Sequence, residues 1–157
     1  MTREGLCIGD EAPDFQLRDQ FGQDVRLSDF RGRKAVALMF FPFAFTGVCT
    51  GELSGVRDRL EQFLSFDTEV LALSCDPVYA LRSFAEAEGL NFPLLSDFWP
   101  HGAVASAYEV FDAVKGAPRR SSYVVDRQGR LTWSVHNANP DGRDLDEHLR
   151  ELHAAVS

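Results

Sequence analysis

The stretch AVALMFFPFAFTGVC, residues 35–49, decides the fold of this chain. Its first seven residues are apolar without alternation, which is typical of a strand buried on both faces. Pro42 follows that strand, and a polar break comes at Thr46 and Gly47. From Cys49 onward the apolar residues recur at intervals of three and four, which predicts an amphipathic helix with Cys49 in its first turn. The apolar positions of this helix are Cys49, Leu53, Val56, Leu60 and Phe63 or Leu64.

Strands and helices alternate on either side of this stretch. The expected elements are a hairpin over 13–27, a helical turn at 28–30, a strand at 69–74, a helix ending at Gly89, a loop over 92–101, a short helix at 104–108, a hairpin over 123–135 and a final helix. Asp76 and Pro77 are the expected cap and first residue of the second helix. Asp144 and Glu147 form a capping-box pattern at the start of the last helix.

This order predicts an α/β protein with a mixed central sheet and helices on both faces, which matches the thioredoxin-like layout. No repeat, low-complexity tract or linker divides the 157 residues, so residues 1–157 are expected to form a single domain.

Charge and hydropathy exclude several classes of partner. The chain carries 16 basic and 24 acidic residues, for a net charge of −8, whereas nucleic acids and anionic membranes call for a basic surface. The longest apolar run, residues 35–45, is too short to span a bilayer. The first residues lack the apolar region of a signal peptide, so a cytoplasmic protein is expected.

The three cysteines, Cys7, Cys49 and Cys75, are widely spaced and form no C-x-x-C motif. This pattern argues against a disulfide framework and against a cysteine-based zinc site. The four histidines include no H-E-x-x-H motif, so no metal site is expected.

The first turn of the helix after residue 46 is the best candidate for chemistry. Ligands of α/β sheets bind beyond the carboxyl ends of the strands, and a helix N-terminus offers unpaired N–H groups and a positive dipole end. Both features favour a thiolate at Cys49. If Thr46 is the N-cap, its hydroxyl is expected to accept a hydrogen bond from the Cys49 N–H and to lie close to the sulfur. Pro42 is expected to stiffen the loop above the Cys49 sulfur. The alternative is that Cys49 is only a small buried apolar residue.

The spacing Pro42-x-x-x-Thr46-x-x-Cys49 resembles the signature of the peroxiredoxins. The stretches FFPFAFTGVCTGEL (40–53), FPLLSDFWPHGAV (92–104) and YVVDRQG (123–129) are similar to the AhpE-type, one-cysteine subgroup of that family. The resemblance extends from APDF at 12–15 to the final helix.

The resemblance implies a thiol peroxidase in which the Cys49 thiolate attacks the peroxide O–O bond and becomes a sulfenic acid, without a metal or haem cofactor. It also implies an arginine beside the sulfur. Arg120 matches that place, although the adjacent Arg119 would fit if the register shifted by one. Glu52 would position Arg120 or bind a peptide N–H near the helix start, and Val48 belongs to the same supporting turn.

The resemblance also bears on how the sulfur is recycled. Other peroxiredoxins place a resolving cysteine five residues after the first, where this chain has Ser54. Cys75 could resolve the sulfenic acid or be an inert strand residue, and Cys7 is incidental or links to another chain. A one-cysteine cycle follows, with an external thiol or a glutaredoxin-like protein as reductant; the subgroup suggests mycothiol with a mycoredoxin.

Aromatic residues near the site raise two further expectations. Phe98 and Trp99 in the loop over 92–101 are expected to form either an interface or a lid over the core. The resemblance to a family that dimerises near its active site implies a homodimer through this region. Phe43 and Phe45 are expected to pack in the core and at its rim, with a role in shaping peroxide access as the alternative. Two other functions stay open. A peroxide sensor or chaperone could use Cys49 as a switch, and a thiol–disulfide oxidoreductase is disfavoured by the missing C-x-x-C motif.

Overall fold

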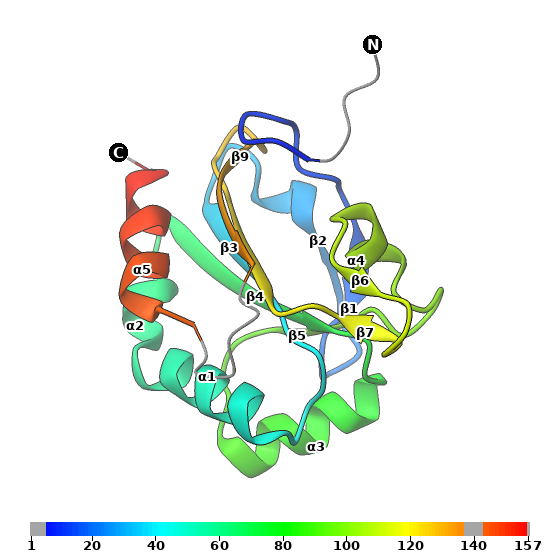
Figure 1. The fold of residues 1–157 in the computed structure, drawn as a ribbon. Coiled ribbons are helices and arrows are strands. Elements are labelled where there is room, and N and C mark those ends of the chain that lie inside the picture. Colours follow the sequence, from blue (N-terminus) through cyan, green and yellow to red (C-terminus); the bar gives the residue numbers. More distant parts are fainter. Residues whose placement is uncertain (1–5, 137–142, 157) are drawn as a thin grey trace.

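A computed structural model gives the structure of the protein and describes residues 6–136 and 143–156 (Figure 1). The N-terminal residues 1–5, on which the expectation of no signal peptide rests, lie outside the described residues. The strands are β1 (Gln16–Arg18), β2 (Asp24–Arg26), β3 (Ala35–Phe40), β4 (Thr68–Ser74), β5 (Leu94–Ser96), β6 (Phe111–Asp112), β7 (Ala117–Pro118), β8 (Ser121–Val125) and β9 (Leu131–His136). The helices are the 3-10 turn η1 (Leu27–Phe30), α1 (Gly47–Asp58), α2 (Leu60–Phe63), α3 (Val78–Glu88), α4 (Ala103–Ala107) and α5 (Leu145–Ala154).

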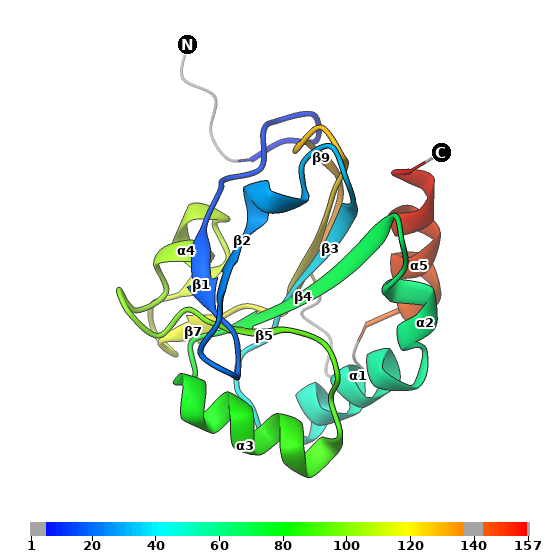
Figure 2. The ribbon, with the colours of Figure 1, turned by 180° about the vertical axis from the view of Figure 1, so that it is seen from behind.

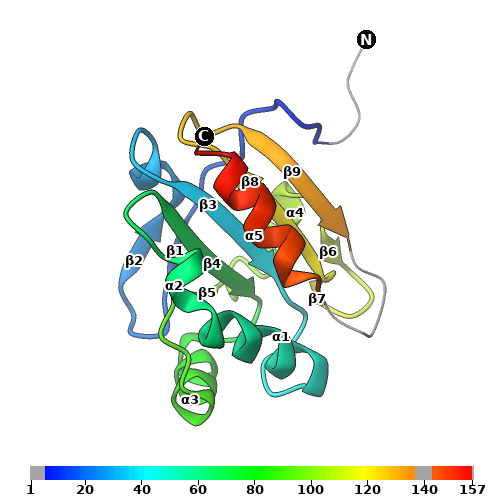
Figure 3. The same ribbon diagram turned by 90° about the vertical axis from the view of Figure 1, so that its left-hand side faces the viewer.

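Seven strands form one mixed sheet in the order β2-β1-β5-β4-β3-β8-β9. The three central neighbours β5, β4 and β3 run parallel, and β8 and β9 extend the sheet antiparallel on one side. The β1–β2 hairpin closes the other side, with β1 antiparallel to β5. The views from behind and from the side show this continuous twisted sheet and the helices against it (Figures 2 and 3). The predicted mixed α/β architecture is confirmed.

Two apolar clusters cover the two faces of the sheet, and β3 contributes alternate residues to each. Ala35, Ala37 and Met39 pack against the helices α1, α3 and α5. Val36, Leu38 and Phe40 pack on the opposite face against η1, α4 and the ring of Tyr108. Because β3 is buried on both faces, it reads as a continuous apolar run in the sequence. α1 starts soon after its carboxyl end.

Two short pairings lie in regions where the sequence analysis predicts no strand. β5 lies within the expected loop over 92–101, where hydrogen bonds to β4 and β1 fix it as a strand. β6 and β7 form a separate two-stranded ribbon before β8. These strands have two or three residues, so their own periodicity carries no signal and their sheet partners determine them.

The predicted helix from Cys49 to Phe63 or Leu64 is wrong in its continuity. α1 ends at Asp58, Arg59 leaves the helical conformation with φ −119° and ψ 23°, and the short α2 follows. At this break the Arg59 guanidinium meets Asp146 of α5 at 2.7 Å. The apolar spacing continues from α1 into α2 because both helices pack against the same core.

The cap predictions have mixed outcomes. Gly89 ends α3 in the left-handed conformation, and the Asp144 carboxylate accepts from the Glu147 N–H at 3.1 Å, so both of these are confirmed. Asp76 does not cap α3, because its carboxylate accepts hydrogen bonds from Ser74 and from a loop near α1.

Candidate active site

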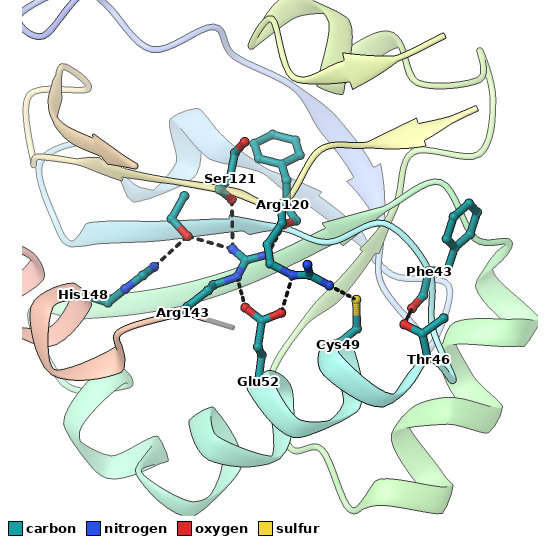
Figure 4. Close-up of polar contacts among 10 residues, drawn as sticks. Phe43, Thr46, Cys49, Glu52, Arg120, Ser121, Arg143 and His148 are labelled. Carbon is teal, nitrogen blue, oxygen red and sulfur yellow. Dashed lines mark hydrogen bonds and ion pairs between the residues drawn. The ribbon is translucent and has the colours of Figure 1, made fainter. Parts of the chain in front are cut away.

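Cys49 is the third residue of α1 and lies completely buried beneath the carboxyl end of β3 (Figure 4). Thr46 is the N-cap residue, with extended backbone angles, as the sequence predicts. The Cys49 side chain belongs to the same apolar cluster as Met39 of β3 and Phe84 of α3. The sulfur therefore lies at the start of a helix in a nearly dry environment, where any nearby charge acts strongly.

The expected bond between the Thr46 hydroxyl and the Cys49 N–H is absent. The hydroxyl instead donates to the Phe43 carbonyl oxygen at 2.8 Å. The Thr46 oxygen keeps its lone pairs for a further donor.

Several contacts hold the loop between β3 and α1. The Ala44 N–H donates to the Asp76 carboxylate at 2.9 Å, which ties the loop to the end of β4. Phe45 has a left-handed backbone with φ 69°, and its ring packs edge-on against Phe84 of α3 at 5.1 Å between centroids. A non-glycine residue in this conformation is strained, so the ring contact and the Asp76 tether must stabilise it.

Arg120, which precedes β8, is the arginine at the sulfur. Its Nη2 lies 3.4 Å from the Cys49 Sγ, and its Nε donates to Glu52 at 2.6 Å. Arg119 points elsewhere and donates to the Glu109 carbonyl oxygen. The structure thereby separates two residues that the sequence leaves open.

Glu52 bridges two arginines. One carboxylate oxygen accepts from Arg120, and the other accepts from the Arg143 Nε at 2.5 Å. The side chains of Glu52 and Arg143 are 5% and 1% exposed, so this is a buried ion pair. Of the two roles expected for Glu52, the structure shows the contact with Arg120.

Arg143 is the functional-site residue that the sequence analysis does not find. Besides Glu52, its guanidinium donates to the carbonyl oxygens of Phe40 and Ser121 and to the Ser122 hydroxyl. It lies in the segment before α5, 91 residues from Glu52 in the sequence. The one available signal was its place just before the Asp144 cap, which by itself indicates only a helix start.

Electrostatics distinguish the two arginines. Burial opposes the charge of Arg120, yet the contacts with Cys49 and Glu52 outweigh it and raise the pKa of the guanidinium. Burial lowers the pKa of Arg143, against the opposing effect of Glu52. Both groups stay charged because guanidinium does not lose its proton in proteins. Two cations and the Glu52 carboxylate leave one positive charge beside the Cys49 sulfur.

A cavity of about 320 Å³ lies beside this cluster. It is lined by Pro42, Asp112, Lys115, Pro118, Arg119, Arg120 and His136. Phe43 and Phe45 are exposed on the same loop as Pro42, and Val48 is half-buried in the first turn of α1. The cavity therefore connects solvent to the guanidinium that contacts the sulfur.

The other two cysteines differ from Cys49. None of the three forms a disulfide. Cys75 is buried after β4, and burial together with Asp97 and Asp76 raises the pKa of its thiol to about 12. Cys7 is exposed, and its backbone N–H donates to the Asp10 carboxylate.

A second cavity, of about 870 Å³, lies away from Cys49 between the β1–β2 hairpin, the start of α3 and the loop after β5. Phe98 and Trp99 line it, and Trp99 is 80% exposed. Phe21 and Tyr79 add two more exposed rings to its wall.

The described residues hold neither a metal-binding cluster nor a membrane-spanning helix. No group of three or more His, Cys, Asp or Glu side chains within 6–136 and 143–156 is arranged to hold a metal ion. No helix in the same part of the chain is long and apolar enough to cross a membrane.

Comparison with known proteins shows extensive similarity. The AhpC/TSA family model matches residues 8–134. Alkyl hydroperoxide reductase E of Mycobacterium tuberculosis is 48% identical over 139 residues, which cover 88% of this chain and 91% of that protein. A chloroplastic 2-Cys peroxiredoxin of Hordeum vulgare is 34% identical over 157 residues, covering 94% and 74% of the two chains.

Solved structures agree with the sequence matches. The crystal structure of peroxidoxin BcpB from Mycobacterium tuberculosis superposes with a TM-score of 0.85 at 32% identity and covers 97% of this chain and 99% of that one. The crystal structure of Enterococcus faecalis AhpC gives 0.85 at 27% identity, with 96% and 92% covered.

Fold, motif and matches together define a class of protein, the peroxiredoxins, which are cysteine-dependent peroxidases with a thioredoxin-like fold. Within that class the chain belongs to the AhpC/TSA family. The family resemblance drawn from the sequence is confirmed.

Proposed function

We propose that Cys49 is the peroxidatic cysteine, which reduces hydrogen peroxide and organic hydroperoxides and becomes a sulfenic acid. The charge balance around the sulfur carries this proposal. Arg120, Arg143 and Glu52 sum to one positive charge, and the Arg120 Nη2 lies 3.4 Å from Sγ. A thiolate at Cys49 neutralises the buried cluster, whereas a thiol leaves a cation uncompensated.

The reaction follows from this arrangement. The Cys49 sulfur forms a bond to the terminal oxygen of the hydroperoxide while the O–O bond breaks. An electron pair moves from sulfur to the leaving oxygen, which takes up a proton and departs as an alcohol or water. The Arg120 guanidinium stabilises the charge that develops on the departing oxygen. The Thr46 oxygen, one helical turn away, accepts a hydrogen bond from the peroxide and orients it.

Peroxide reaches the sulfur through the cavity of about 320 Å³ that Pro42 and Arg120 line. Cys49 itself has no exposed surface, so the first contact of the incoming oxygen is with the Arg120 guanidinium. Pro42 has no N–H and keeps this wall free of a competing donor. Phe43 and Phe45 form the outer rim, and Val48 supports the first turn.

We propose a one-cysteine cycle in which an external thiol returns the sulfenic acid to the thiol. Cys75 is a poor resolving residue because burial keeps its thiol protonated. Residue 54 is Ser, so no second sulfur follows in α1. A low-molecular-weight thiol or a glutaredoxin-like protein, with mycothiol and a mycoredoxin as candidates, would attack the Cys49 sulfenic acid, release water and form a mixed disulfide with Cys49. A second thiol would then attack this disulfide and free the Cys49 thiol.

We further propose that residues 1–157 act as one domain and assemble into a homodimer through the aromatic groove at Phe98 and Trp99. Exposed aromatic rings around a cavity of about 870 Å³ are the surface that supports this. A cytoplasmic location agrees with three cysteines that form no disulfide. Light scattering should give twice the 17.5 kDa mass of the chain, and a monomeric mass at micromolar concentration would overturn the dimer.

One experiment tests the function directly. The reduced protein is treated with one equivalent of hydrogen peroxide in the presence of a sulfenic-acid trap, and its intact mass is measured. One trapped adduct, absent in Cys49→Ser, supports the peroxidatic role. A loss of two hydrogens that links Cys49 to Cys75 would overturn the one-cysteine cycle, and no oxidation of Cys49 would overturn the whole proposal.

Turnover separates the peroxidase from the sensor or chaperone. Repeated consumption of peroxide with an external thiol supports an enzyme. Fast oxidation of Cys49 without turnover would favour a switch.

A further inference from the structure

His148 is a buried polar residue that the proposed reaction does not use directly. It lies on α5 with only 1% of its surface exposed, and its ring packs edge-on against Trp133 of β9 at 4.9 Å between centroids. Its Nδ1 lies 2.6 Å from the Asp144 carbonyl oxygen, and its Nε2 lies 2.7 Å from the Ser122 hydroxyl. An apolar residue could fill the same space, so these two contacts call for a reason.

The partners fix the direction of each hydrogen bond. A carbonyl oxygen only accepts, so His148 carries its proton on Nδ1 and donates to Asp144. The Ser122 oxygen already accepts from the Arg143 Nη1 at 2.7 Å. The Ser122 O–H is then free to donate to Nε2 of a neutral His148. In this tautomer every polar atom of the pair is satisfied.

A continuous chain of polar contacts leads from this pair to the sulfur. Arg143 binds Ser122 on one side and the Glu52 carboxylate at 2.5 Å on the other. Glu52 binds Arg120 at 2.6 Å, and Arg120 reaches the Cys49 Sγ at 3.4 Å. Each inner member of this chain contacts a neighbour on either side, and three separate segments contribute: α1, the start of β8 and the start of α5.

We propose that His148 is a positioning residue for the peroxidatic reaction: in its neutral form it orients the Ser122 hydroxyl, and through Arg143 and Glu52 it keeps Arg120 aligned with the Cys49 sulfur. The proposal rests on the proposed role of Cys49. To the role of Cys49 it adds a second residue, His148, and a dependence of Cys49 reactivity on the protonation state of the His148 imidazole.

Protonation of the imidazole disrupts the chain for a geometric reason. An imidazolium must donate from Nε2, so the Ser122 oxygen faces two cationic donors, His148 and Arg143, and its own proton loses its acceptor. The charged groups facing the ring are Arg143 and Asp144 before α5 and Glu52 on α1, while β8 presents Ser122 and β9 presents Trp133. Burial lowers the pKa of His148, so the neutral state prevails at neutral pH.

The test compares two substitutions at one position. His148→Gln keeps an oxygen that can accept from Ser122 and does not titrate, whereas His148→Leu fills the space without an acceptor. Cys49 reactivity is measured with hydrogen peroxide and, separately, with iodoacetamide, followed by mass spectrometry at the Cys49 peptide. His153→Gln, the same exchange at an exposed site on α5, is the matched control.

At pH 7.5 we expect His148→Leu to slow both reactions of Cys49 about threefold to tenfold, the kinetic equivalent of one hydrogen bond. His148→Gln should stay within about twofold of the wild type, as should His153→Gln. Ser122→Ala breaks the same link from β8 and should match His148→Leu, which keeps the test valid if the leucine variant fails to fold. Wild-type rates in both His148→Leu and Ser122→Ala would overturn the proposal.

A pH profile gives a readout that packing alone would not change. The wild-type alkylation rate should show an additional acid step that coincides with a change in Trp133 fluorescence, because an imidazolium against the indole quenches it. Both the step and the change should be missing in His148→Gln. A glutamine profile identical to wild type would overturn the proposal. If Cys49 is not peroxidatic, peroxide oxidation is absent in every variant while the alkylation differences remain, so the two failures are distinguishable.

Discussion

The buried pair of Glu52 and Arg143 can be tested by a double-mutant cycle of Glu52→Gln, Arg143→Met and the double variant. The two side chains are almost fully buried and meet at 2.5 Å. Glu52→Gln leaves the Arg143 guanidinium without this counterion in a low-dielectric site, whereas after Arg143→Met the Glu52 carboxylate keeps Arg120 at 2.6 Å. Breaking such a pair typically costs about 3–5 kcal/mol. Glu52→Gln should therefore lower the free energy of unfolding by about this amount, a large share of the stability of a typical domain. Arg143→Met should lower it by less, because Glu52 stays paired with Arg120.

The double variant should cost clearly less than the sum of the two single variants. Once both charges are removed, neither remains unpaired, and residues in direct contact show coupling of about 0.5–3 kcal/mol. Met suits position 143 because its length is similar and its flexible thioether can fill the space left by the guanidinium. We expect a coupling near the upper end of that range because the contact excludes water.

Urea unfolding of the reduced protein, followed by circular dichroism, measures these changes through the midpoint at a constant slope. The exposed pair Arg82 and Glu86, at 3.3 Å on α3, supplies the control, since Glu86→Gln should change stability by less than about 0.5 kcal/mol. The reasoning is refuted if both buried single variants lie within about 1 kcal/mol of the wild type, or if the double variant equals their sum.

Three further outcomes are expected. Asp76→Ala removes the acceptor of the Ala44 N–H and should lower the free energy of unfolding by about 1–3 kcal/mol in urea titrations; an unchanged midpoint would show that the loop does not depend on this tether. Burial raises the pKa of Cys75 to about 12, so its thiolate at pH 8 is about a thousandfold rarer than that of an ordinary cysteine. Peptide mapping should therefore show that iodoacetamide labels the exposed Cys7 far faster than Cys75, and equal rates would contradict this. Burial holds the pKa of His148 below its unfolded value of about 6.5, so the unfolded chain binds more protons and stability falls as pH drops below that value. Between pH 7.5 and 5.5 the melting temperature should therefore fall less in His148→Gln than in the wild type, and an equal fall in both proteins would refute this.

Local patterns in the sequence were sufficient where the signal lay within one element. The apolar run of β3, the spacing of α1, Gly89 as the end of α3 and the Asp144 cap all follow from periodicity and backbone preference. Such patterns gave wrong predictions where a contact with another segment of the chain determines the local structure. The break at Arg59, the strand β5 and the diversion of Asp76 from its cap each depend on a neighbouring segment.

In the candidate site, too, some features follow from a single element and others depend on contacts between segments. The sequence by itself determined Cys49 at a helix start, Thr46 as its N-cap residue and Pro42 in the loop before it, because these residues lie within one turn and one loop. Only the tertiary structure decided that the Thr46 hydroxyl binds Phe43, that Arg120 and not Arg119 reaches the sulfur, and that Arg143 completes the ion pair with Glu52. The physical reason is that long-range electrostatics depend on distances between segments, and 91 residues of chain separate Glu52 from Arg143. Sequence spacing places a side chain on its own element, but the packing of elements around a dry sulfur sets which charges meet there.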